Sequence, residues 1–291
     1  MTVPKTILLP TDFSGRCDRP RERAIQLARE WGAQLIVLHV LPKAASGAAV
    51  AAKEDVAQAE ARLRVEVQAP DIQIVTRLAF GSVVQEILNA ATEIAVDLIV
   101  MGISRHDEIG DFVVGTTVER VVQHGSVPTL VVKALAGPHY STLFVGTDFS
   151  DCSMIALHAA VDLFPAAKIT LLHAYQVRLE TLRGRDGPAG DRQAEIAFEL
   201  EAFLDKVNLP GDVRGQLEIN VDYGDVCSVA ADHARTSGTD LAVVGTQGRS
   251  GLVADIMGST ARALMTRLDC DILLIRQYRR VGEALLETDV D

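Results

Sequence analysis

Ile-Leu-Leu-Pro-Thr-Asp-Phe-Ser fills residues 7–14, and Leu-Phe-Val-Gly-Thr-Asp-Phe-Ser fills residues 143–150. Both stretches place the same Thr-Asp-Phe-Ser directly after a short apolar run, which is typical of a buried strand that ends in a turn. A match between two distant parts of one chain indicates an internal duplication, and a duplication decides the architecture.

Three further matches follow in the same order along the chain. They relate 35–40 to 169–174, 97–102 to 240–245, and 127–132 to 270–275. With 291 residues, the chain is long enough for two domains that each bury a core. The sequence therefore predicts a first domain over 1–137 and a second over 138–291, joined at the turn-forming Ala136-Gly137-Pro138-His139.

Each copy alternates short, continuously apolar runs with helical segments, which predicts βαβ units and a parallel sheet. Hydrophobic residues make up 48% of the chain and aromatic residues only 4%, so the core is built from aliphatic side chains, as in helix-covered parallel sheets. Each copy is predicted to be a five-stranded α/β unit with helices on both faces. The predicted strands are 5–10, 34–41, 71–79, 97–101 and 128–132, then 141–147, 168–174, 215–222, 240–245 and 271–275, and the predicted helices of the first copy are 17–31, 50–67, 82–94 and 114–124.

The formal charge of -11 argues against broad binding to nucleic acid, which needs clustered Lys and Arg. Most of the acidity lies in 138–291, where 23 Asp and Glu face 14 Lys and Arg. The four cysteines show no close pairing, which indicates buried reduced thiols. We find neither a signal-peptide pattern nor an apolar stretch of membrane-spanning length, and we expect a cytoplasmic protein.

The richest chemical signal follows the fourth strand of the second copy. It reads Gly245-Thr-Gln-Gly248, and after nine more residues Gly258-Ser259-Thr260 opens a predicted helix. Glycines permit positive φ and a close approach of backbone amides to phosphate oxygens, and a helix N-terminus attracts anions. Arg249 offers a charge-assisted contact to the same anion. A Ser-Thr pair before a helix also fits an ordinary N-cap, so taken alone the loop indicates an anion site and no more.

With its spacing and its repeats taken together, the chain resembles a tandem universal stress protein over roughly residues 3–133 and 140–277. The resemblance implies two Rossmann-like domains of the adenine-nucleotide α-hydrolase-like kind. It also implies that the G-x2-G-x9-G-S loop binds the phosphates and ribose of ATP, and that Asp148 and Ala174 lie near the adenine. Asp12 and Val40 hold the corresponding positions in the first copy.

The first copy departs from this pattern. Its loop reads Gly102-x2-Arg105-x9-Gly115-Thr116-Thr117, so a side chain occupies the place of Gly248. Three acids, Asp107, Glu108 and Asp111, stand where like charge would repel a triphosphate. We expect weak nucleotide binding here, or none. The alternative is that Arg105 holds a phosphate while the acids face solvent or bind a metal ion.

The leading hypothesis is an ATP-binding stress or signalling protein whose nucleotide state selects its partners. The sequence contains no G-x-x-x-x-G-K-(S/T) loop, and the loop of the second copy offers no obvious acid-base pair or nucleophile. No catalytic or metal-binding residue is therefore assigned, although slow hydrolysis stays open. His39 and His173 are interpreted as core or pocket-edge residues.

Two other classes of protein compete with this hypothesis. A nucleotide-dependent ligase or adenylyl-transfer enzyme would carry Ser-Gly-Gly-x-Asp-Ser after its first strand, where this chain has Thr-Asp-Phe-Ser. A structural module with vestigial sites is the other class. The family also pairs through its fifth strand, so we expect 127–132 to pair with 271–275 within one chain as a pseudo-dimer. The resemblance leaves open a homodimer, a protein partner and a Mg²⁺ or Mn²⁺ ion beside ATP.

Overall fold

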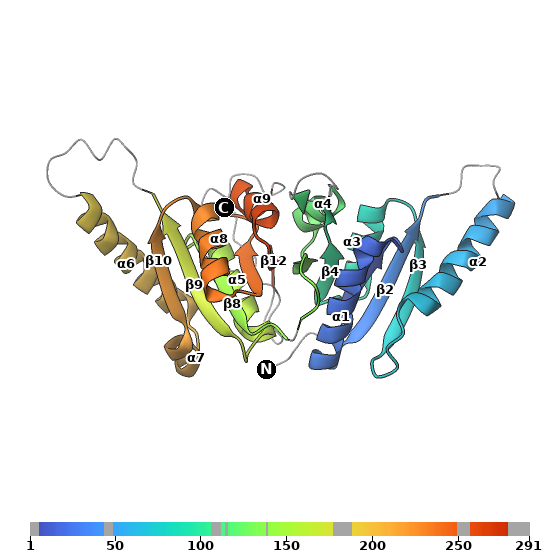
Figure 1. The fold of residues 1–291 in the computed structure, drawn as a ribbon, viewed down its shortest axis with the longest axis horizontal. Coiled ribbons are helices and arrows are strands. Elements are labelled where there is room, and N and C mark those ends of the chain that lie inside the picture. The colour runs from blue at the N-terminus through green and yellow to red at the C-terminus, as the bar shows by residue number, and fades with distance from the viewer. Residues whose placement is uncertain are drawn as a thin grey trace.

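The fold is dominated by one sheet of ten strands that runs through both halves of the chain (Figure 1). The computed structural model describes residues 6–43, 49–105, 112–113, 116–137, 139–176, 188–248 and 257–278. The strand order is β10-β9-β8-β11-β12-β7-β4-β1-β2-β3, so each half of the sequence contributes five adjacent strands.

The elements follow the predicted alternation of strands and helices. The first copy contains β1 (Thr6–Thr11), the 3-10 turn η1 (Gly15–Cys17), α1 (Asp18–Trp31), β2 (Gln34–Leu41), α2 (Ala49–Glu66), β3 (Ile74–Phe80), α3 (Val83–Glu93), β4 (Leu98–Gly102), β5 (Ser104–Arg105), β6 (Phe112–Val113), α4 (Thr116–His124) and β7 (Thr129–Val132). The second contains β8 (Thr142–Gly146), α5 (Asp151–Leu163), β9 (Lys168–Tyr175), α6 (Pro188–Val207), α7 (Gly211–Gln216), β10 (Glu218–Tyr223), α8 (Val226–Ser237), β11 (Leu241–Gly245), α9 (Ser259–Arg267) and β12 (Asp271–Ile275).

Within each half, the five strands of the sheet are parallel and the third, second, first, fourth and fifth lie side by side in that order. This confirms the predicted doubly wound α/β fold. The strand order reverses between β1 and β4 in the first half and between β8 and β11 in the second. Ligands of such sheets bind beyond the carboxyl ends of the strands at this reversal.

The two halves meet edge to edge through their fifth strands. β7 and β12 pair antiparallel, with Leu130 opposite Leu273. These two leucines hold equivalent positions in the two copies, so a pseudo-twofold axis passes between them. The predicted pairing of the fifth strands within one chain is therefore confirmed. Neither fifth strand leaves an unpaired sheet edge, because each pairs with the other.

Helices cover both faces of the sheet, and each face has its own apolar core. Alternate strand residues point to opposite faces, as Leu8 and Leu9 do, because side chains along a strand have a period of two. One core is covered by α1, α2, α5 and α6, and the other by α3, α4, α8 and α9. Both cores contain residues from both halves, so the two copies share a continuous interior.

Two predicted strands begin later than expected. The strand predicted over 71–79 starts at Ile74 and the one predicted over 215–222 starts at Glu218. In the second case the preceding residues form the short helix α7, which starts after Pro210. In the first case Ile72 N donates to Ala69 O in a turn. The small β5–β6 hairpin is a further element that the sequence did not predict.

A buried polar cluster reinforces the seam between the halves. The fully buried carboxylate of Asp271 accepts hydrogen bonds from Lys133 N (2.7 Å), Ala134 N (2.9 Å) and Tyr140 Oη (2.5 Å). Arg23 of α1 lies 3.5 Å from the same carboxylate and stacks over the Tyr140 ring. Asp271 thus joins β12 to the connecting segment and to the first helix.

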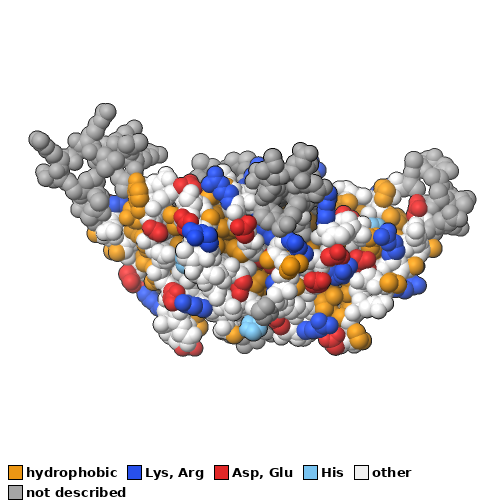
Figure 2. Space-filling view, in the orientation of Figure 1, with side chains coloured by type: hydrophobic (Ala, Val, Ile, Leu, Met, Phe, Trp, Pro, Cys, Tyr) orange, Lys and Arg blue, Asp and Glu red, His pale blue; other side chains and the backbone are white. Residues whose placement is uncertain are grey.

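The surface carries mixed charge despite the acidic balance. On the face that Figure 2 shows, Lys and Arg side chains are interspersed with Asp and Glu. None of the helices in the described part of the chain is long and apolar enough to cross a membrane.

Candidate functional site

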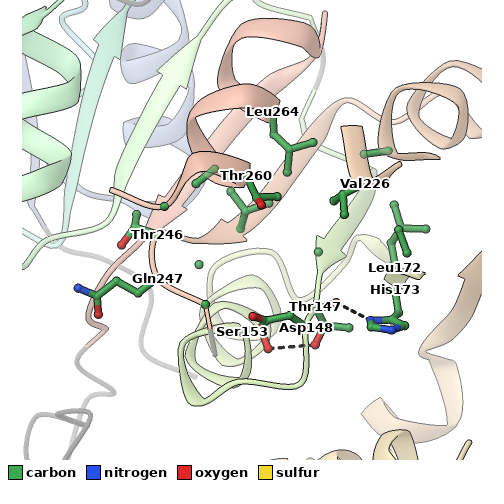
Figure 3. A pocket seen from close by; sticks show the side chains of 18 of the residues that line it. Thr147, Asp148, Ser153, Leu172, His173, Val226, Thr246, Gln247, Thr260 and Leu264 are labelled. Atoms are coloured by element: carbon green, nitrogen blue, oxygen red, sulfur yellow. Dashed lines mark hydrogen bonds between the residues drawn. The ribbon is translucent and has the colours of Figure 1, made fainter. Parts of the chain in front are cut away.

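A cavity of about 390 Å³ opens where the strand order reverses in the second half, between the carboxyl ends of β8 and β11 (Figure 3). Seven of the eight site residues predicted for the second copy line this cavity, and the eighth, Arg249, lies outside the described residues. The seven are Asp148, Ala174, Gly245, Gly248, Gly258, Ser259 and Thr260. In Figure 3 the turn after β8 forms one wall and the first turns of α9 form the opposite wall.

Asp148 is fixed in the cavity wall by a strained turn. Its neighbour Phe149 has φ 63°, a value that is unusual for a bulky residue. Side chains hold this conformation, because Thr147 Oγ1 accepts a hydrogen bond from Phe149 N (2.9 Å) and Asp148 Oδ1 accepts one from Ser150 N (3.1 Å). The repeated Thr-Asp-Phe-Ser therefore encodes a turn that presents an aspartate, and strain of this kind is common at functional sites.

His173 supports this turn from the neighbouring strand. Its Nδ1 donates to the carbonyl oxygen of Thr147 at 2.8 Å, and its ring stacks on Phe149 with centroids 4.3 Å apart. His39 repeats both contacts in the first copy, with Thr11 O at 2.7 Å and Phe13 at 4.2 Å. Both histidines thus lie at the edge of a pocket, as predicted.

The prediction that the loop glycines adopt positive φ is wrong, whereas the predicted close approach of their amides to phosphate stays a prediction. Gly245, Gly248 and Gly258 do not adopt positive φ; those glycines that do are Gly32, Gly81, Gly224 and Gly238 among the described residues. Close approach explains all three instead. A Cβ on Gly245 would lie 2.8 Å from Cys152 Sγ, one on Gly248 2.7 Å from Asp148 Oδ2, and one on Gly258 3.1 Å from Thr246 O.

The N-terminus of α9 faces the cavity without a side-chain cap. The Ser150 side chain caps α5 and the Asp225 side chain caps α8 by accepting an amide hydrogen bond, whereas the cap residue of α9 is Gly258, which has no side chain. The first turn of α9 also carries no acidic residue. An uncapped, acid-free helix end in a cavity wall is suited to bind an anion.

The apolar end of the cavity was not predicted from the sequence; Val226, Ala230 and Val244 line it together with Ala174. A repeated signal was available. Tyr223-Gly-Asp-Val226 corresponds to Phe80-Gly-Ser-Val83, and the glycine has φ 153° in one copy and 148° in the other. This turn directs a valine into the pocket of each copy.

The first copy has a corresponding cavity of about 280 Å³. Four of the predicted residues line it, namely Asp12, Val40, Gly102 and Thr117. Gly115 lies outside the described residues, as do the acids at 107, 108 and 111, and the structure describes only the backbone of Arg105 and Thr116. The two interpretations of Arg105 therefore stay predictions.

Gly102 is required for the same reason as Gly245, because a Cβ there would lie 2.9 Å from Arg16 O.

Hydrogen bonds lower the pKa of the aspartate in the turn after β1. Burial raises the pKa of Asp12, but the hydrogen bonds from Ser14 and Cys17 lower it by more, so the net pKa is below the usual value. Burial raises the pKa of Cys17, so its thiol stays protonated and donates to Asp12 Oδ1 (3.1 Å).

The model of the universal stress protein family matches the chain twice, at residues 4–133 and 139–276. The chain belongs to the universal stress protein family. Universal stress protein G of Escherichia coli O157:H7 is 32% identical over 142 residues, which are 44% of this chain and 99% of that protein. A universal stress protein of Mycobacterium bovis is 23% identical over 215 residues, 71% of this chain and 70% of that protein. A universal stress protein structure from Archaeoglobus fulgidus shares the fold at 18% identity, covering 93% of this chain and 97% of that chain with a TM-score of 0.71.

The two universal stress protein domains, here domain 1 (4–133) and domain 2 (139–276), differ at the apolar end of their pockets. Domain 1 carries the larger side chain at four equivalent lining positions, which are Pro10 for Gly146, Val40 for Ala174, Ile87 for Ala230 and Met101 for Val244. Arg16 also lines the domain 1 pocket, where domain 2 has Cys152. These larger side chains leave less space in the domain 1 pocket, whose volume is about 280 Å³ against about 390 Å³ in domain 2.

Proposed function

We propose that the domain 2 pocket binds ATP and that the chain acts as a nucleotide-dependent regulator in a stress response or signalling process. The observation that carries this proposal is the uncapped N-terminus of α9 in the wall of a 390 Å³ cavity at the strand-order reversal. A cavity of this size fits the range for small-molecule sites.

The two ends of the pocket suit the two ends of a nucleotide. The adenine would lie among Ala174, Val226, Ala230 and Val244, where the lining side chains are apolar. Asp148, whose Oδ2 lies against Gly248, would accept a hydrogen bond from a donor group of the base or the ribose. The phosphates would lie against the α9 amides with Ser259 and Thr260, beside Gly248, with Arg249 adding charge.

Domain 1 would bind the same ligand weakly or not at all. The narrowed apolar end, and not only the altered loop, supports this asymmetry, because Ile87 and Met101 occupy volume that Ala230 and Val244 leave open. Glu119, an acidic residue in the first turn of α4, also disfavours an anion at that helix end. We retain 137/138 as the proposed domain boundary and the cytoplasm as the proposed compartment.

We assign no catalytic residue to this pocket. The imidazole of His173 uses Nδ1 to hold Thr147 O and its ring face to hold Phe149, which is the geometry of a support and not of a general base poised at a substrate. The bound nucleotide would therefore act as a signal more than as a substrate. No described feature selects a metal ion to accompany the phosphates.

Native mass spectrometry and calorimetry on the purified full chain test the proposal. We expect one equivalent of adenine nucleotide to co-purify or to bind when ATP is added. Adenosine should bind more weakly than ATP, because it lacks the phosphates that would meet α9. A chain that retains no adenine nucleotide and releases no heat with ATP would overturn the proposal.

A further inference from the structure

Opposite charges stand at one pair of equivalent positions beside the pseudo-twofold axis. Arg262 is the fourth residue after Gly258, and Glu119 is the fourth residue after Gly115, the equivalent glycine. Arg262 Nε lies 3.3 Å from Glu119 Oε1. Figure 1 shows α4 and α9, which carry these residues, next to each other at the top centre of the molecule.

Each partner belongs to the helix turn that forms one of the pockets. Ser259, Thr260 and Ala261 of α9 line the domain 2 pocket, and Arg262 is the next residue. Thr117 and Val118 of α4 line the domain 1 pocket, and Glu119 follows them. The ion pair therefore connects the first turns of the two helices that face the pockets.

This position makes the charge of Arg262 relevant to an anion at the end of α9. Its Cα lies about 4.5 Å along the helix axis from that of Ser259, at about 1.5 Å per residue. Arg262 N also closes the first turn by donating to Gly258 O (3.1 Å). The Glu119 carboxylate of domain 1 compensates the guanidinium charge that Arg262 would otherwise bring to the first turn of α9.

We infer that domain 1 sets the phosphate affinity of the domain 2 pocket through Glu119. The inference rests on the proposed function. By neutralising Arg262, Glu119 keeps the affinity for the charged end of ATP lower than the α9 site would otherwise give, while contacts to the base are unaffected. Glu119 is thus a specificity-determining residue contributed by the domain whose own pocket is narrowed. The side chain of Glu119 is 25% exposed and that of Arg262 is 54% exposed, so solvent screens the pair and its effect on ATP affinity is modest.

The test measures ATP and adenosine affinity of the full chain by calorimetry for wild type, Glu119→Gln, Arg262→Gln and the double variant. We expect Glu119→Gln to strengthen ATP binding about two- to fivefold, the range that exposed ion pairs span, and to leave adenosine binding unchanged. Arg262→Gln should weaken ATP binding. The gain from Glu119→Gln should shrink in the double variant, because it acts through Arg262.

Glu60→Gln is the matched control, since it removes the same charge from an ion pair with Arg64 on α2 (3.6 Å) away from both pockets. ATP affinity equal in wild type and Glu119→Gln, an equal change for adenosine, or an equal gain from Glu60→Gln would each overturn the inference while leaving the proposed function intact. A wild-type chain that binds neither ligand would instead overturn the proposed function.

Discussion

Gly248 touches the carboxylate of Asp148: a Cβ at residue 248 would lie 2.7 Å from Asp148 Oδ2. One residue comes from the loop after β11 and the other from the turn after β8, and both line the domain 2 pocket. Because Oδ1 of the same carboxylate is held by Ser150 N, the aspartate has little room to move aside.

Gly248→Val should therefore abolish most ATP binding while the domain stays folded. The side chain would fill the space beside Asp148 and displace the loop from the phosphates. We expect a loss of at least about tenfold in affinity, or about 1.4 kcal/mol, by calorimetry. Gly211→Val is the control, because nothing lies within 4 Å of a Cβ there. Equal ATP affinity in both variants would contradict the assignment of the loop.

Ala230→Ile should weaken ATP and adenosine binding equally. It introduces into domain 2 the residue that domain 1 carries at the equivalent position, Ile87, and it fills the apolar end without changing charge. We expect about tenfold or more for both ligands. Gly248→Val should affect ATP more strongly than adenosine, and an identical ratio in the two variants would argue against placing the base and the phosphates at opposite ends.

Gly245→Ala should destabilise the fold, because its Cβ would meet Cys152 Sγ at 2.8 Å and the backbone oxygen of Cys152 at 3.1 Å. Overpacking of this kind costs about 1–3 kcal/mol. Urea denaturation should show the loss relative to Gly211→Ala. Removing the sulfur in Gly245→Ala/Cys152→Ala should restore only part of the stability, since the backbone contact persists. An unchanged midpoint would show that the helix shifts freely.

Lys133 should impose a pH dependence on stability. Burial lowers its pKa from 10.5 to about 8, so above that pH the folded state releases a proton that the unfolded state keeps. Stability should therefore rise with pH between these two pKa values, by up to about 1.4 kcal/mol per unit. The raised pKa values of Cys270, about 11, and of Tyr140 act in the opposite direction.

Comparison of wild type with Lys133→Met reports this contribution together with the lowering that the Lys133 charge exerts on the pKa of Cys270. The difference in free energy of unfolding should grow in favour of wild type from about pH 8 upward and stay flat below it. The exposed Lys168 provides a control in Lys168→Met. A pH-independent difference between wild type and Lys133→Met would contradict the prediction.

Asp271→Asn should be among the more destabilising single changes. It removes the negative charge of a fully buried carboxylate that accepts hydrogen bonds from Lys133 N and Tyr140 Oη. Breaking a buried charged pair costs about 3–5 kcal/mol. Tyr140→Phe, which removes one of the hydrogen bonds, should cost about 1–3 kcal/mol. Denaturation of both variants should be compared with Asp269→Asn, an exposed neighbour. Equal midpoints for the two aspartate variants would show that the seam does not depend on this cluster.

The fold was predictable because its strands are continuous apolar runs. The strands at 34–41 and 271–275 have the predicted bounds, and the fifth-strand pairing also follows the prediction. Errors occur where local turn chemistry outweighs the run, as at the short helix before Glu218. Asp271 lies within an apolar run of the sequence, but its hydrogen-bonding partners come from distant segments that no local pattern reveals.

The sequence predicted most residues that line the candidate site, but it did not predict the packing contacts that require its glycines. Seven predicted residues line one cavity because the loop and the Thr-Asp-Phe-Ser turn end adjacent parallel strands. The need for glycine at Gly245 comes from α5, a packing contact that spacing cannot show. The narrowed end of the domain 1 pocket depends on Ile87 and Met101, which belong to different elements and converge only in three dimensions.

The antiparallel pairing of β7 with β12 has a consequence for how the chain can be divided. The seam includes main-chain hydrogen bonds, the Leu130–Leu273 contact, the Asp271 cluster and the Arg262–Glu119 ion pair, and none of these needs the peptide bonds around Gly137 to stay intact. A protease cut there would leave two fragments that can associate again by pairing β7 of one with β12 of the other. In the same way, two separately made polypeptides, one for each domain, would reassemble through these strands and restore both pockets.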